Sequence, residues 1–502
     1  MKPVKSMFKA VSIITLFAII TRFLGFIFRI YLSNVLGAEG IGIYQIASSI
    51  IGVFMTLIAS GIPLTTAKMV AKYDNSLKLK DKNITTTSSC VIAVVLSVFS
   101  CIILLLGQDF LNIFIKNQTV IDLILIMCPA LIFSAVYAVF RGALWGQNSF
   151  FWVGFTELLE QIIRLILTFI IMACVVNKAF YTKAVALSFT LTCLLSAIFV
   201  IIIYFISGGR LCFSKSNYKE IIKRSAPITG VRLASSFIQP LTALLIPLLL
   251  TQIGYSNSQA IGIYGIIMGM AFPLLFAPLS VVGSLSVVLI PKISILESNK
   301  KYDAISKSVN SSINFSLFLA VVLIPLYLSC GDLIGVVLFN NLQAGVYLQL
   351  SAVCILPLVL NNITSSILNA LNLELKSFIN YIAGTIVLFV SLISLTFVIQ
   401  EKAIIVSMFL STATIAFLNL RKIHSAIPNF KSTVIPDMFK YSLIILPCSV
   451  LGHLISNVLY HYLPALFAGL IGGGISIIST LMLIKIFKVY DFTKFKIRRN
   501  AN

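Results

Sequence analysis

Long apolar runs separated by short polar segments fill almost the whole chain. A helix needs about 20 mainly apolar residues to cross the hydrocarbon core of a bilayer, and most of these runs reach that length. The pattern predicts an all-α polytopic membrane protein with fourteen transmembrane helices and no room for a soluble domain on either side. The predicted helices cover residues 9–33, 42–71, 85–106, 119–145, 153–176, 183–207, 222–252, 258–290, 305–330, 344–371, 376–399, 402–421, 437–460 and 463–487.

The composition agrees with a membrane protein. Of the 502 residues, 59% are hydrophobic and only 10% are charged, whereas about a quarter of the residues in a soluble domain are charged. The net charge of +22 would suit a nucleic acid if it covered a soluble face, but here the charges are distributed among apolar spans. We therefore expect membrane lipids, and no nucleic acid, as partners.

The short basic segment from Met1 to Lys9 raises the question of a secretory signal peptide. No small-residue cleavage site follows, and the apolar run is too long for a signal sequence, so we assign it as the first transmembrane helix. The nine cysteines are scattered without a C-x-x-C motif, and the three histidines lack the spacing of metal ligands. We expect no metal and no cofactor.

Lysine and arginine predict the orientation, because cationic loops stay on the cytoplasmic side. With the N-terminus inside, 28 of the 37 basic residues lie in cytoplasmic segments and four lie on the opposite side. Both termini are therefore predicted to be cytoplasmic. The other five lie within predicted helices, and all are arginine, whose planar fork fits phosphate oxygens: Arg22, Arg29, Arg141, Arg164 and Arg232.

Arg22 and Arg29 lie in the first predicted helix. Seven residues return a helix to within ~20° of the same face, about 10 Å further along its axis. Each arginine in mid-membrane costs roughly 2.5–3.5 kcal/mol. Snorkelling or pairing with carboxylates is one interpretation, but the depth of Arg22, about 20 Å from the helix start, favours an anion-facing wall in a water-filled cavity. We call this face the arginine strip: Thr15, Ala18, Arg22, Gly25, Arg29 and Ser33.

An internal repeat relates the two halves of the chain. The segment 40–44, Gly-Ile-Gly-Ile-Tyr, returns 220 residues later as Ala-Ile-Gly-Ile-Tyr-Gly at 260–265. Because six predicted helices separate the copies, both halves would have the same orientation, as in transporters with parallel repeats. Chance similarity between apolar helices is the alternative. The repeat predicts an N-lobe at 1–208, a C-lobe at 209–424, and two further helices with a basic tail at 425–502.

The seventh predicted helix corresponds to the first under this repeat, and it also carries polar residues on one face. Prolines interrupt its backbone regularity at Pro227, Pro240 and Pro247. Both lobes would then present arginine to a common seam. The polar face of this helix consists of Arg232, Ser235, Ser236, Gln239 and Thr242.

The fourth and fifth predicted helices hold the clear intramembrane carboxylates, Glu157 and Glu160. Glu160 and Arg164 are four residues apart, and Arg141 ends the preceding helix. Two carboxylates and two arginines can neutralise one another. We therefore favour a structural or gating ion-pair cluster of Arg141, Glu157, Glu160 and Arg164 over proton coupling.

Several segments resemble the stage V sporulation protein B group of the multidrug/oligosaccharidyl-lipid/polysaccharide (MOP) exporter superfamily. The likeness runs from the first predicted helix to about Asn372. The segments that carry it are Arg22-Phe23-Leu24-Gly25-Phe26 through Arg29, Gly61-Ile62-Pro63 with Lys68, Arg141-Gly142 through Gln147-Asn148, Glu160-Gln161-Ile162-Ile163-Arg164, and Gly269 to Pro273 through Ser284-Leu285-Ser286 and Ile290-Pro291.

The resemblance implies two six-helix lobes around a central cavity, two extra C-terminal helices, and a flippase in a bacterial cell membrane rather than an enzyme. The implied cargo is a lipid-linked cell-wall or polysaccharide precursor. Lipid II flippases of the superfamily line their cavity with arginines from the first helix, and Arg22 and Arg29 match that motif, with the second arginine one residue later. The predicted cavity residues are Arg22, Arg29, Arg232, Ser236 and Gln239.

Physical chemistry favours the same partner, a lipid-linked oligosaccharide diphosphate, because its diphosphate and sugars cannot cross hydrocarbon unaided whereas its polyprenyl tail stays in lipid. Two alternatives stay open. A cation-coupled multidrug exporter would need acidic residues in the lobes, where arginines outnumber carboxylates. A glycosyl polymerase would need a catalytic acid, and the outer loops offer only Glu39, Asp109, Asp332 and Glu401.

Overall fold

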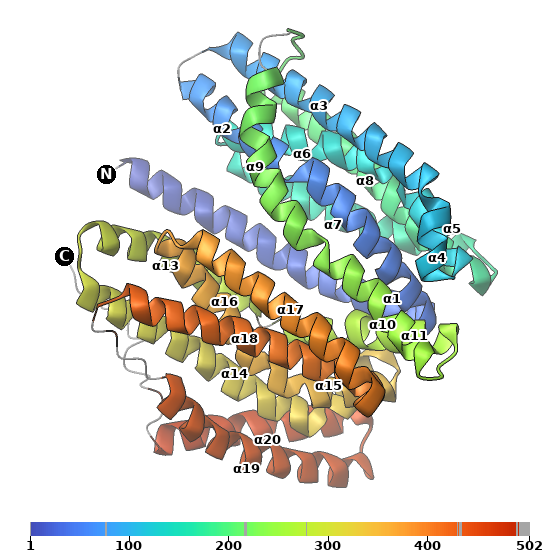
Figure 1. Cartoon of the computed structure of the whole chain (residues 1–502), viewed down its shortest axis with the longest axis vertical. Coiled ribbons are helices and arrows are strands. Elements are labelled where there is room, and N and C mark those ends of the chain that lie inside the picture. Colours follow the sequence, from blue (N-terminus) through green and yellow to red (C-terminus); the bar gives the residue numbers. More distant parts are fainter. Residues whose placement is uncertain are drawn as a thin grey trace. The chain divides into compact units, whose positions relative to one another are not determined.

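A computed structural model describes residues 2–75, 78–214, 218–277, 279–428, 430, 434–487 and 490. Every regular element in this part of the chain is a helix (Figure 1). Several basic residues counted above for the orientation lie outside the described residues: Lys215, Lys431, Lys488, Lys494, Lys496, Arg498 and Arg499.

The chain forms two compact units. The first contains residues up to Thr251 together with Tyr255–Gly265, and the second contains Gln252–Gly254 and the residues from Ile266 onward. Residues 218–251 and 255–265, which the repeat assigned to the second lobe, pack with the first unit through contacts of α9 with α1 and α2 and of α11 with α1. The division into lobes at 1–208, 209–424 and 425–502 stays a prediction based on the repeat.

The helices of the first unit correspond to the first seven predicted spans and the start of the eighth. They are α1 (Lys2–Ala59), α2 (Gly61–Asn75), α3 (Leu79–Leu106), α4 (Gln108–Ile115), α5 (Gln118–Met127), α6 (Ala130–Gly146), α7 (Phe150–Cys174), η1 (Lys178–Phe180), α8 (Tyr181–Ile206), α9 (Tyr218–Ser236), α10 (Ile238–Gln252) and α11 (Asn257–Tyr264).

The second unit is built around the long helix α14, which contacts α13, α15, α16, α19 and α20. Its remaining helices α17 and α18 form a closely packed pair that joins the unit through α16. Its elements are η2 (Gly265–Ala271), α12 (Phe272–Phe276), α13 (Leu279–Ser298), α14 (Tyr302–Phe339), α15 (Leu342–Ser351), η3 (Ala352–Cys354), α16 (Ile355–Ala370), α17 (Glu374–Ile399), η4 (Gln400–Lys402), α18 (Ala403–Ala426), α19 (Val434–Tyr460) and α20 (Ala465–Ile486).

Several predicted spans are broken where the sequence analysis treated them as continuous. Span 119–145 is two helices bent by 41°, and Pro129 lies directly before the second. Spans 42–71 and 222–252 also divide, and the helices after the breaks carry Pro63 and Pro240 in their first turn, where the missing N–H is not needed. Span 258–290 divides into α11, the π-helix η2, α12 and α13.

Within the described residues, ten helical stretches are long and apolar enough to cross a membrane, or eleven with the bent pair α5 and α6. Two of these stretches, Ile13–Asp74 and Glu374–Ala426, contain 62 and 53 residues, and about 20 are enough for one crossing. The chain is therefore a multi-pass membrane protein. Fourteen crossings are consistent with these lengths, and the number stays a prediction.

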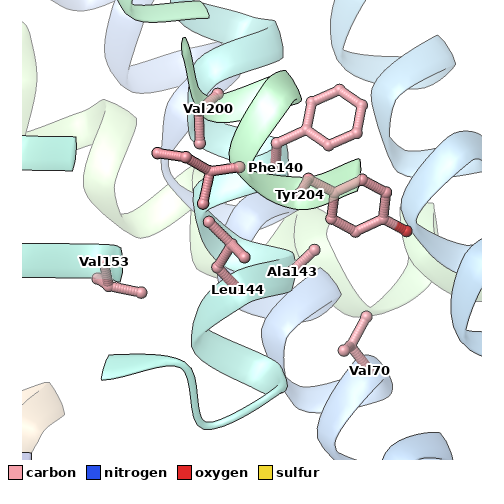
Figure 2. Packing of buried hydrophobic residues seen from close by; sticks show 8 residues of the cluster. Val70, Phe140, Ala143, Leu144, Val153, Val200 and Tyr204 are labelled. Atoms are coloured by element: carbon pink, nitrogen blue, oxygen red, sulfur yellow. The ribbon is translucent and has the colours of Figure 1, made fainter. Parts of the chain in front are cut away.

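A buried core joins α2, α6, α7 and α8 in the first unit (Figure 2). The ring of Phe140 lies edge-on to the ring of Tyr204, with 5.0 Å between their centroids. Val70 and Val153 complete the contact from α2 and α7. The Tyr204 hydroxyl donates a hydrogen bond of 3.1 Å to the Asn83 side chain at the start of α3. This core fixes the second half of α6. It therefore also fixes the position of Arg141, which directly follows Phe140 in the sequence.

Candidate functional site

The helix α1 consists of two limbs separated at Gly37, whose φ of 68° places it in the left-handed region that favours glycine. Arg29 on the first limb donates a hydrogen bond of 3.2 Å from Nη2 to Oε1 of Gln45 on the second limb. The Ser33 hydroxyl, one turn further on, donates to the backbone carbonyl of Arg29 at 2.8 Å. The arginine strip is therefore tied to the second limb at Arg29.

The two copies of the internal repeat pack against each other close to this point. A Cβ on Gly42 would lie 2.2 Å from the carbonyl oxygen of Ile261, and a Cβ on Gly265 would lie 2.2 Å from that of Ala38. Only glycine allows such an approach of two backbones. The tyrosines of both copies, Tyr44 and Tyr264, interact electrostatically with Arg29. Each copy of the repeat thus supplies one tyrosine to the electrostatic environment of Arg29.

Arg22, one step further along the strip, is exposed, and it makes no hydrogen bond or ion pair within the described part of the chain. The face of α1 beside the strip packs against α7. Phe17 contacts Phe151 with 5.6 Å between ring centroids, and the Phe17 ring lies so close to Gly154 that a Cβ there would be 2.6 Å away. These contacts fix α1 relative to α7, and therefore fix Arg22 relative to the charged residues of α7.

The four charged residues of α6 and α7 form two ion pairs. Arg141 Nη2 lies 2.5 Å from Glu157 Oε2, and Arg164 Nη2 lies 2.6 Å from Glu160 Oε1, one helical turn away. All four side chains are partly buried. The guanidinium of Arg164 also lies over the ring of Phe189, 5.5 Å from its centroid. The structure thus brings together all four members of the predicted cluster, with each carboxylate taken up by one arginine.

Further polar groups connect this cluster to the arginine strip. Tyr137 on α6 interacts electrostatically with Arg141, Glu157 and Glu160. Tyr44, which contacts Arg29 electrostatically, also interacts with Arg164. Tyr44 therefore interacts electrostatically with an arginine of the strip and with one of the ion pairs, and these residues all belong to the first unit.

The predicted polar face of the seventh span lies on two helices. Arg232 is exposed on α9, and the hydroxyl of Ser236 donates to the carbonyl of Leu233 in its own helix at 2.8 Å. Gln239 is exposed on α10, beyond the break at Phe237. Since α9 contacts α1, Arg232 belongs to the same unit as Arg22 and Arg29. Its place in a shared cavity stays a prediction.

Three members of this site were not predicted from the sequence: Gln45, Tyr264 and Tyr137. Of these three, Tyr264 carried a signal, because it occupies the same position in its repeat copy as Tyr44 does in the other. Within the described residues, no group of three or more His, Cys, Asp or Glu side chains could hold a metal ion.

Comparison with known proteins identifies the family. Residues 7–297 match the family described as polysaccharide biosynthesis protein. The chain is 23% identical to stage V sporulation protein B of Bacillus subtilis (strain 168) over 400 residues, which cover 76% of each chain. It is 22% identical to sporulation protein YkvU of the same organism over 355 residues, which cover 68% of this chain and 77% of that protein.

Solved structures of the same fold are transporters. The lipid II flippase MurJ in an inward closed conformation matches with a TM-score of 0.68 and 17% identity, covering 94% of this chain and 98% of that one. A multidrug resistance MATE family transporter of the MOP superfamily, inward-facing, matches with a TM-score of 0.67 and 12% identity, covering 82% and 96%. The resemblance to the MOP superfamily found in the sequence is confirmed. The chain belongs to the polysaccharide biosynthesis protein family and has the fold of the MOP superfamily transporters.

Proposed function

We propose that this protein is a flippase that moves a polyprenyl-diphosphate oligosaccharide, a lipid II-like cell-wall or polysaccharide precursor, from the cytoplasmic to the outer leaflet by alternating access. One observation carries the proposal. Both carboxylates of α7 are taken up by Arg141 and Arg164, whereas Arg22 and Arg29 share a helix face that contains no acidic residue. The charge on this face is suited to an anion supplied by a ligand.

The chemistry of the strip matches a diphosphate. Guanidinium groups form paired, charge-assisted hydrogen bonds with phosphate oxygens, and such bonds are stronger in a site that excludes water. The neutral amide of Gln45 orients Arg29 through its oxygen without neutralising the charge. The polyprenyl tail needs no protein contact, because it can stay in the lipid while the head group crosses.

The comparisons support this proposal without fixing the cargo. One solved structure of this fold is described as a lipid II flippase, and the family is described as acting in polysaccharide biosynthesis. The distribution of lysine and arginine supports an orientation with both termini in the cytoplasm, and the Bacillus subtilis relatives support a location in a bacterial cell membrane. The solved structures of this fold are a lipid II flippase and a multidrug transporter, and we propose that this chain is likewise a transporter and not an enzyme.

The membrane potential supplies a sufficient driving force in principle. An inside-negative potential of ~100 mV acts on each unit charge with about 2.3 kcal/mol and favours outward movement of an anion. A diphosphate carries at least one such charge through the site. A coupling ion is therefore not required by the physics of the proposed transport.

Transport in liposomes tests the proposal. The full-length protein is reconstituted with a fluorescent polyprenyl-diphosphate disaccharide, and the fraction accessible to an impermeant quencher is followed over time. We expect the protein to speed exchange between the leaflets, and a negative potential inside to bias it outward. Movement of cationic dyes under a sodium or proton gradient, without movement of the lipid, would instead support a MATE-like drug exporter. Formation of sugar polymer would indicate an enzyme.

A further inference from the structure

Gln161 on α7 is a polar residue in a largely buried position. Its side chain belongs to a residue only 8% exposed, and within the described residues it has no hydrogen-bond partner. Its amide nitrogen and oxygen do not belong to the fully buried polar atoms that lack a partner, so the amide keeps accessible surface at which it can bind a ligand or a water molecule. Its neighbour Glu160, by contrast, is paired with Arg164.

The amide of Gln161 faces the arginine strip at Gly25. A Cβ on Gly25 would lie 3.6 Å from Nε2 of Gln161 and 3.9 Å from its Cδ. Gly25 has no side chain, so nothing from α1 covers the amide at this point. Any larger residue at position 25 would lie in van der Waals contact with Nε2 and screen it from the strip.

The position of Gly25 along the axis of α1 shows where the Gln161 amide lies relative to the two arginines. With a rise of 1.5 Å per residue, Gly25 lies about 4.5 Å beyond Arg22 and about 6 Å before Arg29 along the helix axis. The Gln161 amide therefore meets the strip between the two guanidiniums. Both arginine side chains are long enough to reach a group bound at this height. Near the start of α7, Phe17 of α1 packs on Phe151 and Gly154, and this contact holds α7 against α1.

We propose that Gln161 is a third contact to the substrate, donating a hydrogen bond from Nε2 to a phosphate oxygen that lies between Arg22 and Arg29. This inference rests on the proposed function, because it assumes that the strip binds a diphosphate. A neutral donor suits this position. A carboxylate would pair with the arginines and repel the phosphate, and a lysine would add a third positive charge to the empty site.

The arrangement also predicts selectivity. Two arginines whose backbone positions lie about 10 Å apart along the helix, with an amide between them, offer donors that two linked phosphates can use better than one. A polyprenyl diphosphate should therefore use all three groups, and a polyprenyl monophosphate only some of them. Loss of the Gln161 donor should reduce the preference for the diphosphate.

Binding of two defined lipids to the purified full-length protein tests the inference. The probes are polyprenyl diphosphate and polyprenyl monophosphate, both without sugar, and the affinities are measured by native mass spectrometry. Gln161→Leu removes the donor, and Gly25→Ala leaves the donor in place but covers it. The matched controls are Gln108→Leu, an exposed glutamine on α4, and Gly52→Ala on α1, where a Cβ would meet nothing within 4 Å.

We expect both test variants to bind the diphosphate at least tenfold more weakly, since a hydrogen bond to a charged group is lost, with a smaller change for the monophosphate and no change in the controls. Melting temperatures should stay close to that of the unchanged protein. Unaltered diphosphate binding by folded Gln161→Leu would overturn the inference and leave the proposed function intact. If Gln161→Leu fails to fold, unaltered binding by Gly25→Ala overturns it. Failure of the unchanged protein to bind either lipid would count against the proposed function itself.

Discussion

The guanidinium of Arg29 donates to the amide oxygen of Gln45 across the two limbs of α1, with 3.2 Å between Nη2 and Oε1. The arginine is therefore held by a neutral group that leaves its positive charge in place. Buried arginines that serve the fold are usually paired with a carboxylate, as Arg164 is with Glu160. The two arginines thus differ in the chemistry of their partners, and their substitution should have different effects.

Replacement of Arg22 or Arg29 by alanine should reduce lipid transport at least tenfold while the protein still inserts and folds. Arg22 has no ion pair within the described part of the chain, and the Gln45 amide to which Arg29 donates is neutral, so removing either charge from the membrane relieves a cost. Lysine at either position should restore transport only in part, because it keeps the charge and loses the paired donors. Leaflet exchange in liposomes measures lipid transport, and thermal melting in detergent measures whether the variant is folded.

Arg421→Ala is the matched control, because Arg421 is exposed at the end of α18 in the second unit. It should leave transport unchanged. Normal transport by the Arg22→Ala, Arg29→Ala double variant would show that the strip is not the substrate site. If the double variant instead had both a lower melting temperature and lower activity, the two arginines would be structural counter-ions.

The pair of Arg141 and Glu157 connects α6 to α7 across a short turn, so it should matter for stability. Arg141→Glu or Glu157→Arg alone places like charges together and leaves a partly buried charge unsatisfied, at a cost of roughly 1–3 kcal/mol. We expect lower melting temperatures and impaired transport. The double reversal should recover part of both.

The control for this charge reversal is the pair of Arg224 and Glu220, which lies in the same unit at 2.7 Å but with side chains about half exposed. Exposed pairs contribute less than about 1 kcal/mol, so its reversal should have little effect. If single reversals at Arg141 and Glu157 were equally harmless, the cluster would have no structural or gating role.

Hydropathy and local spacing predicted a large part of this fold. Each apolar run is helical within the described residues, because an isolated backbone in lipid has to satisfy its own hydrogen bonds. The pairing of Glu160 with Arg164 follows from four-residue helical spacing. The break at Ser60 was not predicted, although Pro63 lies three residues further on. The break at Phe237 lies three residues before Pro240, one of the prolines expected to interrupt that helix, whereas Pro227 and Pro247 lie inside continuous helices.

The rest of the candidate site depends on how the helices pack against one another. The spacing of residues along one helix carries no information about that packing. Gln45 reaches Arg29 only because α1 breaks at Gly37, and Gln161 reaches Gly25 only because α7 packs against α1. In the sequence, Gln161 is one polar residue beside two charged ones, with no periodic pattern to distinguish it. The contact between the repeat copies was likewise absent from the pattern, which showed similarity and not proximity.

The predicted orientation can be tested by labelling cysteines from outside intact cells. Lys80→Cys, exposed at the start of α3, should stay unreactive toward an impermeant maleimide, because the loop before α3 is predicted to be cytoplasmic. Val176→Cys should react, because Val176 is 95% exposed just after the C-terminal end of α7, on the side predicted to face outward. Both are made in a background without the nine native cysteines. Labelling of Lys80→Cys from outside the cell would contradict the predicted cytoplasmic location of this loop.

The contact between the two repeat copies makes a last prediction, because two glycines at matching positions of the repeat have different surroundings. A Cβ on Gly42 would lie 2.2 Å from the backbone oxygen of Ile261, whereas on Gly262 its nearest neighbours would be 3.9 Å away. Gly42→Ala should therefore push α11 from α1 and cost about 1–3 kcal/mol, as overpacking does. Gly262→Ala should be neutral or stabilise its helix by up to about 1 kcal/mol, because alanine has the higher helix propensity. Thermal melting compares the two. Since Tyr44 and Tyr264 both approach Arg29, only Gly42→Ala should also weaken binding of polyprenyl diphosphate. Equal behaviour of the two variants would mean that the copies do not pack through their glycines.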